Sequence, residues 1–195
     1  MRKREFIKKG AVLSTSIIAS SSMGLGRTSL KEKRDISNRQ SDKSMNLVIG
    51  SDHAGFPLKG TLIKILQSWN YNIKDVGSFN PDPVDFPDIA LLLADEIKSG
   101  RARLGIMVCG TGIGASMVCN KIQGIRAALC HDTYSAHQCV EHDNANVLCM
   151  GAQIIGPSIA EEVMSNFLNA EFSTEEQFRR RVEKLNQFDL IPPEK

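Results

Sequence analysis

The sequence lacks the marks of several common protein classes. Its 195 residues include five cysteines, an odd number that excludes a fully paired disulfide framework. None belongs to a C-x-x-C pair of the kind that holds zinc or exchanges disulfides. No apolar run is long enough and apolar enough to span a bilayer, and no internal repeat is visible. We therefore expect one globular domain with no metal site and no membrane span in the mature protein.

Charge is distributed unevenly along the chain. Residues 1–44 hold 11 Lys/Arg and 4 Asp/Glu, a net charge of +7, whereas residues 45–195 hold 13 and 18, a net charge of −5. A mildly acidic body gives no electrostatic case for binding nucleic acid. We expect no nucleic-acid partner.

The basic N-terminus has the plan of an export signal. Residues 1–10 are basic, and residues 11–23 are moderately apolar and rich in Ser and Ala. The stretch Lys3-Arg4-x-Phe6-Ile7-Lys8 resembles the twin-arginine export motif, with Lys in place of the first arginine. We predict an exported, periplasmic protein; the alternative is a disordered basic tail on a cytoplasmic one. The predicted organisation is an export signal and polar linker over 1–44, a domain over 45–190 and a tail over 191–195.

The body alternates between apolar strands and helical periodicities. The pattern predicts strands at 46–51, 71–77, 104–108, 124–130 and 146–151. It predicts helices at 56–69, 89–99, 115–121, 133–141, 158–169 and 174–188, with a proline-rich loop over 81–88. Ser158 is the expected N-cap of one helix, and Thr174 is expected to open a capping box at the last. This order indicates an α/β fold: a three-layer, Rossmann-like arrangement of a five-stranded parallel sheet with helices on both faces.

The stretch Cys109-Gly110-Thr111-Gly112-Ile113-Gly114 joins the third strand to a helix. Glycines let a ligand approach the backbone, and a helix N-terminus presents unpaired N–H groups to an anion. Near those groups, Cys109 can be held as a thiolate. The simpler interpretation is a tight turn with a buried cysteine.

Ligands of parallel α/β sheets bind at the carboxyl ends of the strands. That rule gathers several polar groups on one edge: Asp52, His53, the 109–114 loop, His131, Asp132 and Gln153. The first strand ends in Asp52-His53-Ala54-Gly55 and not in G-x-G-x-x-G, which disfavours a nicotinamide dehydrogenase. We expect His131, His137 and the other four cysteines to be structural.

Six segments together resemble the family of type B ribose-5-phosphate isomerase and galactose-6-phosphate isomerase. They are 50–55 (GSDHAG), 84–88 (VDFPD), 109–114 (CGTGIG), 120–127 (NKIQGIRA), 142–147 (HDNANV) and 181–183 (RVE). The resemblance implies a homodimer with a Rossmann-like sheet and an enzyme of pentose phosphate metabolism. Its active sites are shared between subunits, and it interconverts an aldose and a ketose through a cis-enediolate without a metal or cofactor.

The resemblance also implies roles for individual residues. Cys109 is the base, Thr111 exchanges protons with the sugar oxygens, and His142 opens the sugar ring. The expected substrate contacts are Asp52, His53, Gly110, Gly112, Ile113, Gly114, Asp143 and Arg181, with the loop amides holding the enediolate oxyanion. For Asp52 the alternative is a helix cap, and for His142 a surface position at a helix end.

Some positions depart from the family pattern. Gln153 and Gln177 stand where phosphate-binding arginines are usual, and Arg179 or Arg180 can substitute only by a shift in register. Asp143 replaces an asparagine, and Phe86 replaces a tyrosine. We therefore hypothesise an isomerase acting on ribose 5-phosphate or a related sugar, with an unphosphorylated or differently substituted sugar favoured. A non-catalytic sugar-binding or sensing protein on the same fold is the alternative.

Overall fold

Five parallel strands form one sheet in the order β2-β1-β3-β5-β4. They are β1 (Asn46–Ser51), β2 (Asn72–Asp75), β3 (Leu104–Cys109), β4 (Ala127–Leu129) and β5 (Val147–Gly151). The three central strands are almost wholly buried, because helices cover both faces of the sheet. The computed structural model describes residues 46–190, so the export signal, the linker and the tail predicted above lie outside the described residues.

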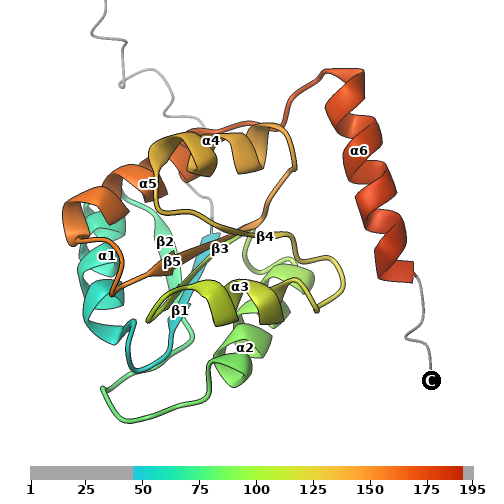
Figure 1. Ribbon diagram of the computed structural model, residues 1–195. Coiled ribbons are helices and arrows are strands. Elements are labelled where there is room, and N and C mark those ends of the chain that lie inside the picture. Colours follow the sequence, from blue (N-terminus) through green and yellow to red (C-terminus); the bar gives the residue numbers. More distant parts are fainter. Residues whose placement is uncertain (1–45, 191–195) are drawn as a thin grey trace, which may run out of the picture. The chain divides into compact units, whose positions relative to one another are not determined.

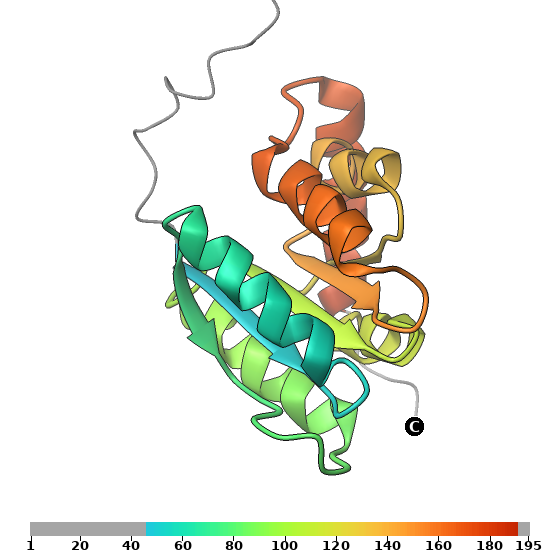
Figure 2. The same ribbon diagram turned by 90° about the vertical axis from the view of Figure 1, so that its left-hand side faces the viewer.

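Two helical layers sandwich the sheet (Figures 1 and 2). On one face lie α1 (Phe56–Ser68), α4 (Thr133–Glu141) and α5 (Pro157–Asn169), whose apolar residues pack with Leu47, Ile49 and Ile106. On the other face lie α2 (Phe86–Lys98) and α3 (Ile113–Cys119), which pack with Val48 and Met107. Alternation of side chains along each strand supplies both cores. The predicted α/β architecture is confirmed.

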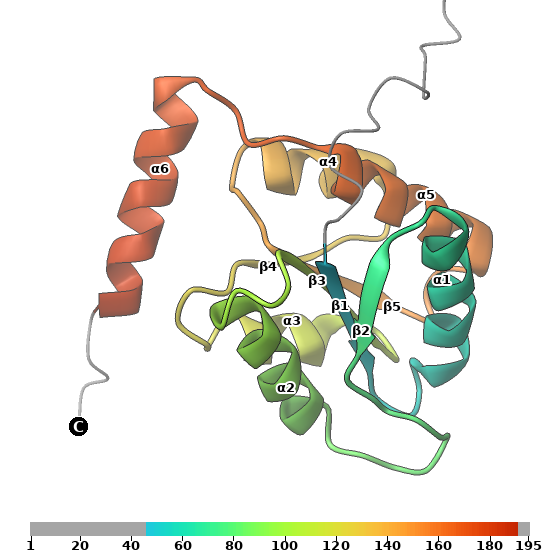
Figure 3. The same cartoon turned by 180° about the vertical axis from the view of Figure 1, so that it is seen from behind.

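The last helix, α6 (Glu176–Gln187), runs into a short 3-10 turn, η2 (Phe188–Leu190), beside the β4 edge (Figure 3). Val182 is its one buried residue. The N–H of Gly124 in the body donates to the carboxylate of Asp189, which lies in η2, at 3.0 Å. None of the described helices is both long and apolar enough to cross a membrane.

Four helix starts differ from the predicted ones, among them that of α3, which begins at Ile113, two residues early. Helix α2 begins at Phe86, three residues early, because Pro87 is tolerated in the first turn of a helix. Helix α5 likewise begins at Pro157, so Gly156 and not Ser158 is its N-cap. The capping box at Thr174 does not form, because Glu175 is the N-cap of α6 and makes no side-chain cap.

Candidate active site

Cys109 and Asp52 meet at the carboxyl edge of the sheet. Cys109 is the last residue of β3, and Asp52 follows the last residue of the neighbouring strand β1. Both are buried, at 8% and 5% exposure, and the Cys109 thiol donates to Asp52 Oδ2 at 2.9 Å. The other carboxylate oxygen, Oδ1, accepts the N–H of Gly55, the N-cap of α1, at 2.8 Å. Asp52 thus accepts a hydrogen bond from the turn before α1, as its helix-cap alternative predicts. It also contacts the Cys109 thiol.

The surroundings of Cys109 favour the thiol over the thiolate that the loop amides could hold. Burial raises the pKa of the Cys109 thiol, and the hydrogen bond to Asp52 and the charge of that carboxylate raise it further. The N–H groups of Gly112 and Gly110 point toward the sulfur and lower the pKa, but their effect is smaller. The resting group is therefore a thiol, hydrogen-bonded to a carboxylate that can accept its proton.

The glycine loop lies directly over the end of β5. Gly112 has a φ of 78°, and a Cβ there would meet Leu129 Cδ1 at 2.6 Å and the Met150 carbonyl carbon at 2.9 Å. A Cβ at Gly114 would lie 2.8 Å from Cζ of Phe86. Gly112 is therefore required by both its conformation and the Met150 backbone, whereas Gly114 packs against the end of the Phe86 ring.

Thr111 is exposed at the tip of the loop. Its Oγ1 accepts the N–H of Ile113 at 3.3 Å, while Ile113 itself is 49% exposed. A hydroxyl held in this way at the open edge can exchange a proton with a ligand. The proton-exchange role of Thr111 and the substrate contact of Ile113 stay predictions.

Gln153 and His131 complete the same edge. The N–H of Gln153 donates to Gly110 O at 2.9 Å, and its Oε1 lies 3.5 Å from where a Gly110 Cβ would be. His131 Nε2 accepts the N–H of Gly151 at 3.0 Å, which supports the structural role predicted for it. The gathering of these groups with Asp52 and Cys109 was predicted from strand ends alone, and the structure bears it out.

His53 lies on the surface, next to Asp52 in the chain. Its Nδ1 accepts the N–H of Val84 at 3.3 Å. The proton of the neutral ring therefore sits on Nε2, which is free to donate to a ligand. The substrate-binding role of His53 stays a prediction.

His142 belongs to a separate cluster on α4 and α6. Its ring stacks on Phe178 with centroids 4.0 Å apart and planes 8° apart. The guanidinium of Arg181 lies 5.6 Å above the same Phe178 ring. Sequence reasoning joined His142 and Arg181 only through the resemblance and did not assign a role to Phe178, which stands between them.

This second cluster lies at the opposite edge of the sheet from Cys109. Residues 142–146 connect the end of α4 to the start of β5, and Asn146 O accepts the N–H of Gly105 near the start of β3. Cys109 ends β3, five residues on from Leu104, a distance of roughly 16 Å along a strand. One chain therefore does not place His142 over its own Cys109.

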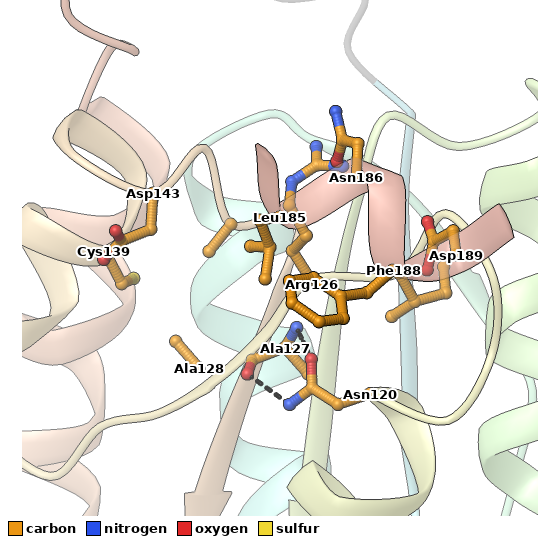
Figure 4. A pocket seen from close by; sticks show the side chains of 12 residues that line it. Asn120, Arg126, Ala127, Ala128, Cys139, Asp143, Leu185, Asn186, Phe188 and Asp189 are labelled. Atoms are coloured by element: carbon orange, nitrogen blue, oxygen red, sulfur yellow. Dashed lines mark hydrogen bonds between the residues drawn. The ribbon is translucent and has the colours of Figure 1, made fainter. Parts of the chain in front are cut away.

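A cavity of about 340 Å³ adjoins the second cluster, between α6 and the β4 edge (Figure 4). Asp143 and Arg126 line it, and Arg126 Nε donates to Asn144 O at 2.7 Å. Asn120 closes its floor with two 2.8 Å hydrogen bonds to the backbone of Ala127. The Asp143 carboxylate is thus exposed at this edge and not beside Cys109.

The three arginines of α6, at positions 179, 180 and 181, point to different partners, so they do not form one cluster that could take over the role of an arginine at position 177. Arg180 pairs with Glu176 at 2.9 Å, and the Arg179 guanidinium lies 5.0 Å over the ring of Phe172. Arg181 alone lies over the His142–Phe178 stack. Across residues 46–190, no cluster of His, Cys, Asp or Glu side chains could hold a metal ion.

Comparison with known proteins covers nearly the whole described body. A family model described as Ribose/Galactose Isomerase matches residues 47–185. The D-erythrulose-4-phosphate isomerase of Pectobacterium atrosepticum is 44% identical over 131 residues, which cover 66% of this chain and 85% of that protein. The ribose-5-P isomerase B of Listeria innocua is 43% identical over 129 residues, which cover 66% and 87%.

Solved structures share the fold. Ribose-5-phosphate isomerase B from Clostridium thermocellum is similar with a TM-score of 0.73 at 38% identity, over 75% of this chain and 98% of that one. The Mycoplasma genitalium ribose-5-phosphate isomerase B with bound ribulose-5-phosphate gives 0.72 at 36% identity, over 76% and 99%.

Proposed function

The chain belongs to the ribose/galactose isomerase family, and from this we propose that it is an aldose–ketose isomerase of sugar phosphates working through a cis-enediolate. The observation that carries the chemistry is the buried contact between Cys109 Sγ and Asp52 Oδ2 at the open edge of the sheet. It pairs a proton donor with an acceptor where a parallel sheet binds ligands.

The thiol becomes a base by giving its proton to Asp52. The proton moves along the 2.9 Å hydrogen bond, which leaves a thiolate and a neutral carboxylic acid. The thiolate removes the proton from the carbon next to the aldose carbonyl, and the electron pair forms the enediolate. The Thr111 hydroxyl exchanges the proton between the two oxygens, and Cys109 returns its proton to the other carbon to give the ketose.

The ring-opening group comes from a second copy of the chain. His142 lies at the opposite edge from Cys109, so a site that uses both needs two subunits. We propose a homodimer in which the His142–Phe178–Arg181 cluster of one subunit faces the Cys109 edge of the other. Arg181 then supplies a cation for the substrate's phosphate.

The residues that would hold the phosphate bear on which sugar the enzyme prefers. Relatives are named for ribose 5-phosphate and for D-erythrulose 4-phosphate. Gln153 places a neutral amide next to Gly110, where the resemblance predicts a phosphate-binding arginine. Charge-assisted hydrogen bonds are roughly twice as strong as neutral ones. This favours a sugar phosphate whose phosphate group is placed differently from that of ribose 5-phosphate, with Arg181 as the one predicted cation.

The basic N-terminus supports export as a further proposal. A signal of the twin-arginine type delivers folded protein to the periplasm, where free sugars are met more often than sugar phosphates. Fractionation of cells expressing the full chain, with and without an Arg4→Ala substitution, tests it. Retention of the unsubstituted protein in the cytoplasm contradicts it.

The isomerase proposal is tested by solvent deuterium incorporation. Purified protein is incubated in D₂O with ribose 5-phosphate, erythrulose 4-phosphate, galactose 6-phosphate and the free sugars. We expect deuterium at the carbon next to the carbonyl of at least one sugar, and its loss in Cys109→Ala, which keeps ligand binding. A folded wild type that exchanges no proton with any of them, yet binds one, indicates the sugar-binding alternative.

A further inference from the structure

Lys59 is a charged residue in the interior. It lies in α1, one turn after the N-cap, and is 1% exposed. A buried ammonium is costly unless all its protons are bonded. Here Nζ donates to Asp75 Oδ1 at 2.6 Å, to Asp75 Oδ2 at 2.7 Å and to the carbonyl of Ser78 at 2.7 Å. The rings of Phe56 and Phe79 flank it, 5.8 and 5.3 Å from Nζ.

Its partners hold the start of the loop that follows β2. Asp75 ends β2, and its Oδ1 also accepts the N–H of Gly77 at 3.0 Å. The backbones of Gly77 and Ser78 then form hydrogen bonds with Ser51, the last residue of β1. The N–H of Ser51 donates to Gly77 O at 2.6 Å, and the N–H of Ser78 donates to Ser51 O at 2.6 Å. The loop is therefore tied on two sides, to α1 by a charge and to β1 by its backbone.

The far end of the same loop orients His53. Val84 donates its N–H to His53 Nδ1, and Phe86, two residues on, packs against Gly114. His53 is itself two residues beyond Ser51. If the 77–84 loop were displaced, the Val84 N–H would no longer donate to Nδ1. The neutral His53 ring would then carry its proton on either nitrogen.

We infer that Lys59 is a positioning residue, which clamps the 77–84 loop on β1 so that His53 presents its Nε2–H to the substrate. Stability alone explains the ion pair poorly, because apolar residues often replace a buried pair without loss. The inference rests on the proposed function only in taking His53 to face the sugar.

The test removes both charges together, so that no lone charge is left inside. In Lys59→Met/Asp75→Asn, the ¹⁵N shifts of His53 Nδ1 and Nε2 are measured at alkaline pH, where imidazole rings are neutral. We expect the wild type to show one tautomer with Nε2 protonated, and the double variant to show a mixture. Leu66→Val, a substitution on the buried face of the same helix, is the matched control and keeps the single tautomer.

Activity gives a second, separate readout. We expect kcat/KM of the double variant to fall on the order of tenfold to a hundredfold, while the rate of Cys109 alkylation stays within twofold of the wild type. If the double variant does not fold, Lys59→Met alone serves, because the Asp75 carboxylate that it leaves is 30% exposed, and a smaller shift in the same direction is expected.

A folded variant whose His53 keeps the wild-type tautomer overturns the inference, as does an equal change in Leu66→Val. The tautomer is read without turnover. A protein with no isomerase activity therefore refutes the proposed function and leaves the result on Lys59 standing.

Discussion

The Cys109 sulfur is surrounded by opposing influences on its charge. Burial and the Asp52 carboxylate raise its pKa, and the loop amides of Gly110 and Gly112 lower it. Since the first set is larger, the thiol form dominates at neutral pH and the thiolate forms only as the pH rises through the raised pKa. The proposed base therefore depends on Asp52 to take its proton during the reaction.

Replacement of Asp52 by Asn separates these two effects. The charge is lost, so the pKa of Cys109 falls and half-maximal alkylation by iodoacetamide moves to lower pH by roughly one unit. Isomerisation falls instead, on the order of 10²- to 10⁴-fold, because the proton acceptor is gone. Asn still caps the turn at Gly55, which protects the fold.

Cys109→Ala gives the background labelling of the other four cysteines, all of them buried. An unchanged or raised pH of alkylation in Asp52→Asn contradicts the assignment of the carboxylate as the group that keeps the thiol protonated.

At the scale of the element, the β3–α3 turn depends on backbone conformation as much as on side chains. Gly112 has a φ of 78° and no room for a Cβ. Gly124, after α3, has a φ of 83° with no heavy atom within 4 Å of a Cβ position. The two glycines share a conformation and differ in their surroundings.

Alanine substitutions at these two glycines separate the cost of the left-handed backbone from the cost of steric contact. Gly124→Ala is expected to lower the free energy of unfolding by about 1 kcal/mol, the cost of a left-handed alanine. Gly112→Ala carries the same cost plus collision with Leu129 and the Met150 backbone. Its loss is expected to exceed that of Gly124→Ala by about 1–3 kcal/mol, with loss of isomerisation. Urea unfolding of both variants measures the difference, and equal losses would show that the loop shifts to accept the Cβ.

At the scale of the whole molecule, the two halves of the proposed site lie at opposite edges of one sheet. Asp52 and Cys109 are at the carboxyl edge, while His142 and Arg181 meet around Phe178 beyond the amino edge. A two-fold dimer places each half against its complement, so that one interface makes two sites.

Mixing of inactive chains tests that arrangement. Cys109→Ala and His142→Ala are each expected to be inactive. Refolded together in equal amounts, half the dimers are mixed and each contains one intact site, so about a quarter of the wild-type activity returns. Cys109→Ala refolded with Asp52→Asn is the control and returns none, because both lesions lie in the same half. Failure of the first mixture to exceed its components refutes the shared site.

Much of the fold and part of the site could be predicted from the sequence. Hydrophobic periodicity located every strand and helix, and helix α4 was predicted at its observed bounds. Helix starts were less certain, because Pro87 and Pro157 can either block a helix or begin one. Strand ends placed Asp52, Cys109 and Gln153 on one edge, since the carboxyl ends of parallel strands coincide. Nothing in the pattern revealed Lys59, whose buried charge is visible only with Asp75 beside it.

The sequence by itself determined the α/β order, the glycine loop and the residue types able to move protons, because each depends on neighbours along the chain. Tertiary structure alone decided the protonation of Cys109, the burial of Lys59 and the separation of His142 from Cys109. These depend on through-space distance, and the groups concerned are far apart in sequence: 57 residues separate Asp52 from Cys109. A pKa or a shared site is set by what burial and folding bring within a few ångströms.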